Sequence, residues 1–143
     1  MIQILTHNVT ETEQAGGQLA SRLSPGAVVA FTGDLGAGKT AFCRCFLHAL
    51  GYTGRVTSPT FAIVNEYETE LCRVCHFDMY RILDEDALYD IGWDDYFDGD
   101  TILLVEWSEN VSGAMPEDCI TVDIRRGEAE DDRIITIKGG ELH

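Results

Sequence analysis

The stretch that most constrains this chain is GDLGAGKT at residues 33–40, because a strand-like run precedes it and a helix-like run follows. Residues 27–32, AVVAFT, form a continuous apolar run typical of a strand covered on both faces. Residues 41–50 place apolar side chains at helical intervals, and Gly51 predicts the end of that helix. A strand, a glycine-rich turn and a helix in this order predict a phosphate-binding loop.

The predicted loop consists of Gly33, Asp34, Leu35, Gly36, Ala37, Gly38, Lys39 and Thr40. Its glycines permit backbone angles that let successive N–H groups point at phosphate oxygens, and the N-terminus of the following helix adds positive charge. Lys39 is expected to reach the β- and γ-phosphates, and the Thr40 hydroxyl to ligate Mg²⁺. The loop therefore predicts a nucleoside triphosphate and magnesium as ligands.

Two acids follow apolar runs that are typical of strands. VCHFD ends at Asp78 and ILLVE ends at Glu106. If both strands run parallel to residues 27–32, their carboxyl ends open onto one crevice and both acids face Thr40. One acid would hold Mg²⁺, directly or through water, and the other would orient the attacking water. The sequence leaves open which acid does which.

Two further segments are candidates for the surroundings of the phosphates. TSPTF, at residues 57–61, is consistent with a mobile segment in which Thr60 or Ser58 senses the γ-phosphate, and also with a simple proline turn. Trp107, directly after Glu106, is equally consistent with lining the nucleotide pocket and with packing beside a core strand.

The whole pattern predicts an α/β fold with a P-loop NTPase-like mixed sheet, mainly parallel at its centre, flanked by helices and closed by a C-terminal antiparallel hairpin. Strands are expected at residues 2–5, 27–32, 61–67, 71–77, 101–105, 119–124 and 133–138, and helices at 10–23, 41–50 and 84–91. Thr10 with Glu13 three residues later has the capping-box spacing. With 143 residues, we expect a single P-loop ATPase domain over 1–143.

The net charge of −15 arises beyond residue 50, because residues 1–50 hold three acids and three bases. Residues 84–100 contain eight carboxylates and no base. Such a surface repels a nucleic-acid backbone, so direct binding of nucleic acid is not expected. The acidic stretch is consistent with a solvated face and with docking onto a basic protein partner.

The sequence predicts a cytoplasmic location without membrane association. No apolar run approaches the roughly 18–20 residues that a membrane helix needs. The first residues, MIQILTHNVTETEQ, lack the basic region, the apolar stretch and the cleavage site of a secretory signal. Five cysteines fit a reducing compartment, and Cys72 and Cys75 lie three apart in a predicted strand, where they would face opposite sides rather than share zinc.

Three other functions share some of these features. A small-molecule kinase needs an acceptor site and usually a lid with arginines, and no long lid insertion is visible. A GTPase of the Ras type uses Asn-Lys-x-Asp, but neither Lys39 nor Lys138 follows an asparagine. A nucleotide-sensing binding module with little hydrolysis remains an alternative, because a lone subunit can be slow until a partner completes its site.

In this order and spacing, GDLGAGKT, SPTF, HFDMYR and VEW resemble the bacterial TsaE family, also called YjeE. The resemblance implies a cytoplasmic ATPase required to form N6-threonylcarbamoyladenosine beside the anticodon of tRNAs that read codons beginning with A. It also implies that ATP is hydrolysed to ADP in complex with the partners TsaB and TsaD. Such a protein supports turnover without transferring the threonylcarbamoyl group, and meets tRNA only through the complex.

The resemblance also assigns residues by position. Residues 35–40 would bind the triphosphate, Glu106 matches the magnesium-associated acid, and Asp78 matches the Walker B-like aspartate. Thr60 falls in the switch-like SPTF segment. Towards the two ends of the chain, Thr10 and Arg133 match positions that contact the nucleotide in the family.

Overall fold

The computed structural model describes residues 1–33, 39–56, 64–79, 82, 86–90 and 92–139. The strands are β1 (Ile2–Thr6), β2 (Val28–Gly33), β3 (Val64–Glu68), β4 (Arg73–Asp78), β5 (Thr101–Glu106), β6 (Ile120–Arg126) and β7 (Arg133–Lys138). The α-helices are α1 (Val9–Ala20), α2 (Lys39–Ala49) and α3 (Asp86–Asp90), and the 3₁₀ helices are η1 (Trp93–Tyr96) and η2 (Ser108–Ala114). The predicted strands and α-helices are confirmed, with shifted ends, whereas the 3₁₀ helices were not expected.

The described strands form one seven-stranded sheet in the order β1-β7-β6-β2-β5-β4-β3. Strands β6, β2, β5 and β4 run parallel at its centre. The outer pairs, β1 with β7, β7 with β6 and β3 with β4, are antiparallel. The predicted fold class is therefore confirmed, with one addition: β1 extends the sheet beyond the C-terminal hairpin by pairing with β7.

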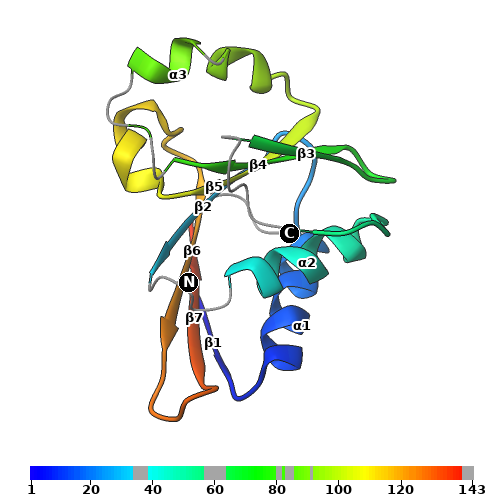
Figure 1. The fold of residues 1–143 in the computed structure, drawn as a ribbon, viewed down its shortest axis with the longest axis vertical. Helices are drawn as coiled ribbons and strands as arrows, with labels where there is room; N and C mark the ends of the chain where they lie inside the picture. Colours follow the sequence, from blue (N-terminus) through cyan, green and yellow to red (C-terminus); the bar gives the residue numbers. More distant parts are fainter. Residues whose placement is uncertain (34–38, 57–63, 80–81, 83–85, 91, 140–143) are drawn as a thin grey trace.

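Helices cover both faces of the sheet (Figure 1). Helices α1 and α2 lie side by side on one face, where their apolar residues pack on β2, β5 and β6. The short elements α3, η1 and η2 contribute Leu88, Trp93 and Val111 to a second core on the other face. This layering is expected for strands that are apolar on both sides.

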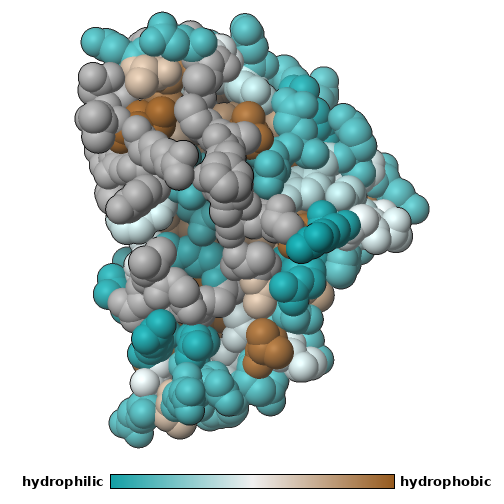
Figure 2. Space-filling model, viewed as in Figure 1, coloured by the Kyte–Doolittle hydropathy of each residue, from teal (hydrophilic) through white to brown (hydrophobic). Residues whose placement is uncertain are grey.

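Hydrophilic residues dominate the face shown in Figure 2, where hydrophobic patches are few and separate. The acidic side chains between positions 86 and 100 that the structure describes are exposed, and they are Asp86, Asp90, Asp94, Asp95, Asp98 and Asp100. Arg73 lies 3.6 Å from Asp98 and 3.8 Å from Glu66, so part of this charge is balanced locally. The remainder forms an acidic surface around α3 and η1.

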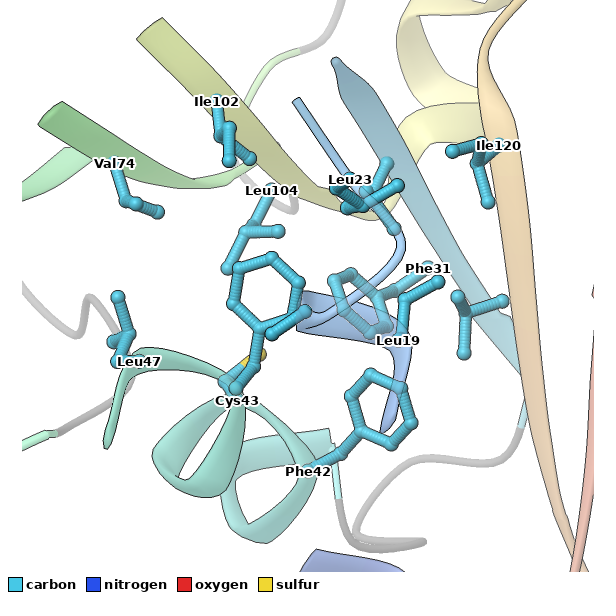
Figure 3. Packing of buried hydrophobic residues seen from close by; sticks show 14 of the residues in the cluster. Leu19, Leu23, Phe31, Phe42, Cys43, Leu47, Val74, Ile102, Leu104 and Ile120 are labelled. Carbon is cyan, nitrogen blue, oxygen red and sulfur yellow. The ribbon is translucent and has the colours of Figure 1, made fainter. Parts of the chain in front are cut away.

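The core on the face of α1 and α2, here called the first core, packs α2 against the strand that leads into the predicted loop. Figure 3 shows Phe42, Cys43 and Leu47 of α2 together with Phe31 of β2 and Leu104 of β5. The rings of Phe31 and Phe42 meet edge to face with centroids 5.7 Å apart. Burying each of these large side chains stabilises the fold by roughly 1.5–3 kcal/mol. The start of α2 is thus held firmly against the end of β2.

The start of α1 differs from the prediction. Its N-cap is Asn8, whose side chain accepts a hydrogen bond from the backbone N–H of Glu11, and not Thr10. Glu11 in turn accepts a bond from the backbone N–H of His7. The prediction was wrong because an Asn with Glu three residues later satisfies the same capping chemistry two positions earlier.

Candidate functional site

The carboxyl ends of the central parallel strands bring the two predicted acids together. Asp78 ends β4 and is the direct cross-strand partner of Glu106, which ends β5. Glu106 in turn pairs with Phe31 of β2, two residues before Gly33. The expectation that these strands run parallel is confirmed. Both acids therefore lie at the edge of the sheet where β2 leads toward α2.

Gly33 closes β2 in a conformation that other residues rarely adopt. Its φ angle is +114°, and a Cβ atom placed there would fall 2.1 Å from the carbonyl oxygen of Ile124. Glycine is therefore required both by the backbone angle and by the close approach of β6. The loop residues Asp34, Leu35, Gly36, Ala37 and Gly38, as well as Thr60, lie outside the described residues.

Lys39 opens α2, and Thr40 follows in its first turn. The ammonium nitrogen of Lys39 lies 5.8 Å from the centroid of the Trp107 ring. Trp107 has a φ angle of +59°, which is unusual for an aromatic residue and turns the chain sharply after Glu106. Its ring also packs against the second core, so Trp107 serves in packing and contacts the predicted phosphate-binding lysine. The Thr40 side chain lies outside the described part of the chain.

Glu106 has a partner that the sequence analysis missed. Nε2 of His76 lies 2.7 Å from Oε2 of Glu106, and both residues are buried. His76 precedes Asp78 by two positions in β4, so both side chains emerge on the face that carries α1 and α2. The signal in the sequence was this alternation within HFD, which places the histidine and the aspartate on one side.

The two remaining candidates, Thr10 and Arg133, lie at the same edge of the sheet, further from β2. Arg133 begins β7 and pairs with Thr6, the last residue of β1. Its Nη1 donates to the carbonyl oxygens of Glu130 and Asp132. Thr10 is exposed in the first turn of α1. In the order of strands, β6 separates Arg133 from the end of β2.

The donor set at this edge fits magnesium better than zinc. Among the described residues, no group of three or more His, Cys, Asp and Glu side chains is arranged to hold a metal ion. Two carboxylates at the ends of neighbouring strands suit Mg²⁺, which usually binds through one or two carboxylates together with substrate phosphates and water. Cys75 is buried in the second core while Cys72 packs against the first, and burial raises the pKa of Cys75 to about 11. The expectation that this pair faces opposite sides is confirmed.

The comparisons with known proteins agree on the family. The family described as threonylcarbamoyl adenosine biosynthesis protein TsaE matches residues 6–135. A tRNA threonylcarbamoyladenosine biosynthesis protein TsaE of Bacillus subtilis is 40% identical over 131 residues, which cover 92% of this chain and 81% of that protein. The chain belongs to the TsaE family.

Further relatives support this membership. The TsaE protein of Haemophilus influenzae is 45% identical over 97 residues, which cover 68% of this chain and 61% of that protein. The crystal structure of YdiB from Bacillus subtilis matches with a TM-score of 0.79 and 33% identity, over 96% of this chain and 84% of that one. The resemblance drawn from the four motifs is thus confirmed. In the described part of this TsaE chain, no helix is long and apolar enough to cross a membrane.

Proposed function

We propose that this TsaE chain is a single-domain, cytoplasmic, Mg²⁺-dependent ATPase that acts in the formation of threonylcarbamoyladenosine in tRNA. The observation that carries the proposal is the pairing of Asp78 with Glu106 at the carboxyl ends of β4 and β5, beside the strand that leads to α2. Membership of the TsaE family supports the pathway, and the P-loop pattern supports ATP as the ligand.

In the proposed mechanism, each residue of the site has a limited task. The backbone N–H groups of residues 34–38 would hold the phosphates, and Lys39 would bind oxygens of the β- and γ-phosphates. Thr40 and one of the two acids would ligate Mg²⁺, which when bound neutralises charge on the phosphate oxygens. The other acid would orient the water that attacks the γ-phosphorus, so that ADP and phosphate leave.

The remaining candidates would act around this centre. Thr60 would sense the γ-phosphate, and Trp107 would border the phosphates on the side of Lys39, which it already contacts. Thr10 and Arg133 would contact the nucleotide at the opposite end of this edge of the sheet. These four roles extend the proposal and are separable from the phosphate-binding core by single substitutions.

The proposed partners are TsaB and TsaD, whose complex this chain would serve by hydrolysing ATP between rounds of transfer. The acidic surface around α3 and η1 supports a basic protein partner and disfavours direct contact with tRNA. The chain would therefore meet tRNA only through that complex, and would not itself transfer the threonylcarbamoyl group.

The direct test is phosphate release from ATP by the purified chain, with and without the TsaB–TsaD complex. We expect release to require Mg²⁺, to rise when the complex is added, and to disappear in Lys39→Ala and Thr40→Ala while both variants stay folded by circular dichroism. Normal turnover in either variant would show that the site is misplaced. Absence of stimulation, together with unchanged release by Glu106→Ala, would contradict a coupled ATPase.

A further inference from the structure

The side chain of His76 is buried in a way that packing alone does not explain. The side chain is 1% exposed, and its Nε2 lies 2.7 Å from Oε2 of Glu106. A carboxylate can only accept hydrogen bonds, so Nε2 must carry the proton of this bond. In a neutral ring, Nδ1 is then an acceptor, and within the described part of the chain it has no hydrogen-bond partner.

An acceptor buried without a partner costs folding free energy. An apolar side chain of similar size at position 76 would avoid this cost, since the position adjoins Val74 and Leu104 of the first core. The imidazole is therefore better explained by what it does to Glu106 than by what it adds to the core. Carboxylates that ligate a metal are commonly oriented by a hydrogen bond to one of their oxygens.

We propose that His76 is a positioning residue: its Nε2–H fixes one oxygen of Glu106 and thereby presents the other oxygen to the magnesium ion of bound ATP. This inference rests on the proposed function and adds a residue to it. His76 itself contacts neither nucleotide nor metal, so it acts through Glu106 alone.

The test compares two substitutions of similar size. His76→Gln keeps an N–H donor the same number of bonds from Cβ as Nε2, whereas His76→Leu removes the donor. For each folded protein, the affinity for a non-hydrolysable ATP analogue is measured by calorimetry across a series of Mg²⁺ concentrations and also in EDTA. For His76→Leu, we expect the Mg²⁺ concentration that gives half of the gain in analogue affinity to rise by about tenfold or more. His76→Gln should stay near wild type, and the affinity in EDTA should be equal in all three.

A measurement on the ligand-free wild-type protein is independent of activity and of the variants' folding. The ¹⁵N NMR spectrum of the histidine ring is expected to show His76 protonated at Nε2. A ring protonated at Nδ1 alone would overturn the inference, as would a wild-type Mg²⁺ requirement in folded His76→Leu. If the affinity of the wild-type protein for the analogue does not depend on Mg²⁺, the proposed function is overturned, and this inference with it.

Discussion

The ammonium group of Lys39 lies 5.8 Å from the centre of the Trp107 ring, so the lysine at the start of α2 rests over an aromatic face. Such a cation–π contact contributes about 0.5–1 kcal/mol at a partly exposed site. A charge-assisted hydrogen bond to a phosphate is stronger. We therefore expect Lys39 to move away from the ring when a triphosphate binds. The fluorescence emission of Trp107 should change as a result.

The first prediction concerns the fluorescence of Trp107. The second tryptophan of the chain, Trp93, is buried against Phe77, so a Trp93→Phe variant isolates the emission of Trp107. Adding ATP and Mg²⁺ to this variant should change the emission, because the cation leaves the ring. The same titration in a Trp93→Phe, Lys39→Met protein should lack this change. Constant emission while equilibrium dialysis shows bound ATP would contradict the prediction.

The second prediction separates turnover from binding at Asp78. Asp78→Ala should lower kcat for ATP hydrolysis by about 10²-fold or more if the carboxylate orients the attacking water. The Kd for ATP should change much less, because the phosphate-binding loop and α2 are untouched. Steady-state kinetics and calorimetry measure the two quantities, and Asp94→Ala serves as a control at an exposed acid. If Asp78→Ala weakens ATP binding by the same factor as it lowers kcat, Asp78 has a structural role instead.

The third prediction concerns the contact between α1 and α2. A Cβ atom at Gly16 would lie 2.1 Å from the carbonyl oxygen of Phe42, which is backbone and cannot move aside. Gly16→Ala should therefore lower the free energy of unfolding by about 1–3 kcal/mol in urea titrations. At Gly17 the nearest atom is Sγ of Cys45 at 3.3 Å, so Gly17→Ala is the matched control and should cost far less. Equal stability of the two variants would count against the close packing.

The fourth prediction is a pH dependence at the β1–β7 edge. Nδ1 of His7 lies 3.0 Å from Oδ1 of Asp132, and this hydrogen bond, with the nearby charges of Asp132 and Glu11, raises the pKa of His7 above 6.5. The same hydrogen bond lowers the pKa of Asp132 below 3.8. A raised histidine pKa stabilises the fold fully below pH 6.5, and this stabilisation is lost as the pH rises through the pKa of His7 in the folded protein. The lowered aspartate pKa stabilises above 3.8, so the pair contributes most between the two values.

His7→Gln should accordingly be less stable than wild type at about pH 5.5 and equal to it at about pH 8. Urea unfolding at both pH values measures the difference, which should be small and should shrink with added salt because both groups are exposed. A difference that is the same at both pH values would rule out the charged pair as its cause.

The fifth prediction concerns the acidic surface. If it docks onto a basic partner, the amount of TsaB–TsaD retained by the immobilised chain should fall as salt rises. Replacing Asp94 and Asp95 by Asn should reduce retention at low salt. Replacing Glu128 and Glu130 by Gln, which removes the same charge from the exposed β6–β7 loop, should leave retention near wild type. If the amount of retained TsaB–TsaD does not change with salt concentration, these carboxylates are merely solvated.

Much of the site was visible in the sequence because it follows local rules. Asp78 and Glu106 each come directly after an apolar run, and parallel strands bring such ends together. Non-local contacts were not visible in this way. His76 looked like a strand residue until the register placed Glu106 within reach, and nothing local to residues 2–6 specifies pairing with β7. The prediction of the N-cap of α1 failed for a different reason. Asn8 with Glu11 and Thr10 with Glu13 both have the capping-box spacing, so this pattern does not distinguish between them.

The place of β1 at the far edge of the sheet has a consequence for synthesis on the ribosome. The only strand it pairs with in the described sheet is β7, more than a hundred residues later in the chain. Helices α1 and α2 can pack against each other early, since they are close in the chain. Strand β1 must nevertheless wait, with its backbone donors and acceptors in water, until β7 has been synthesised. Pairing of β1 therefore follows the synthesis of every other strand of the described sheet.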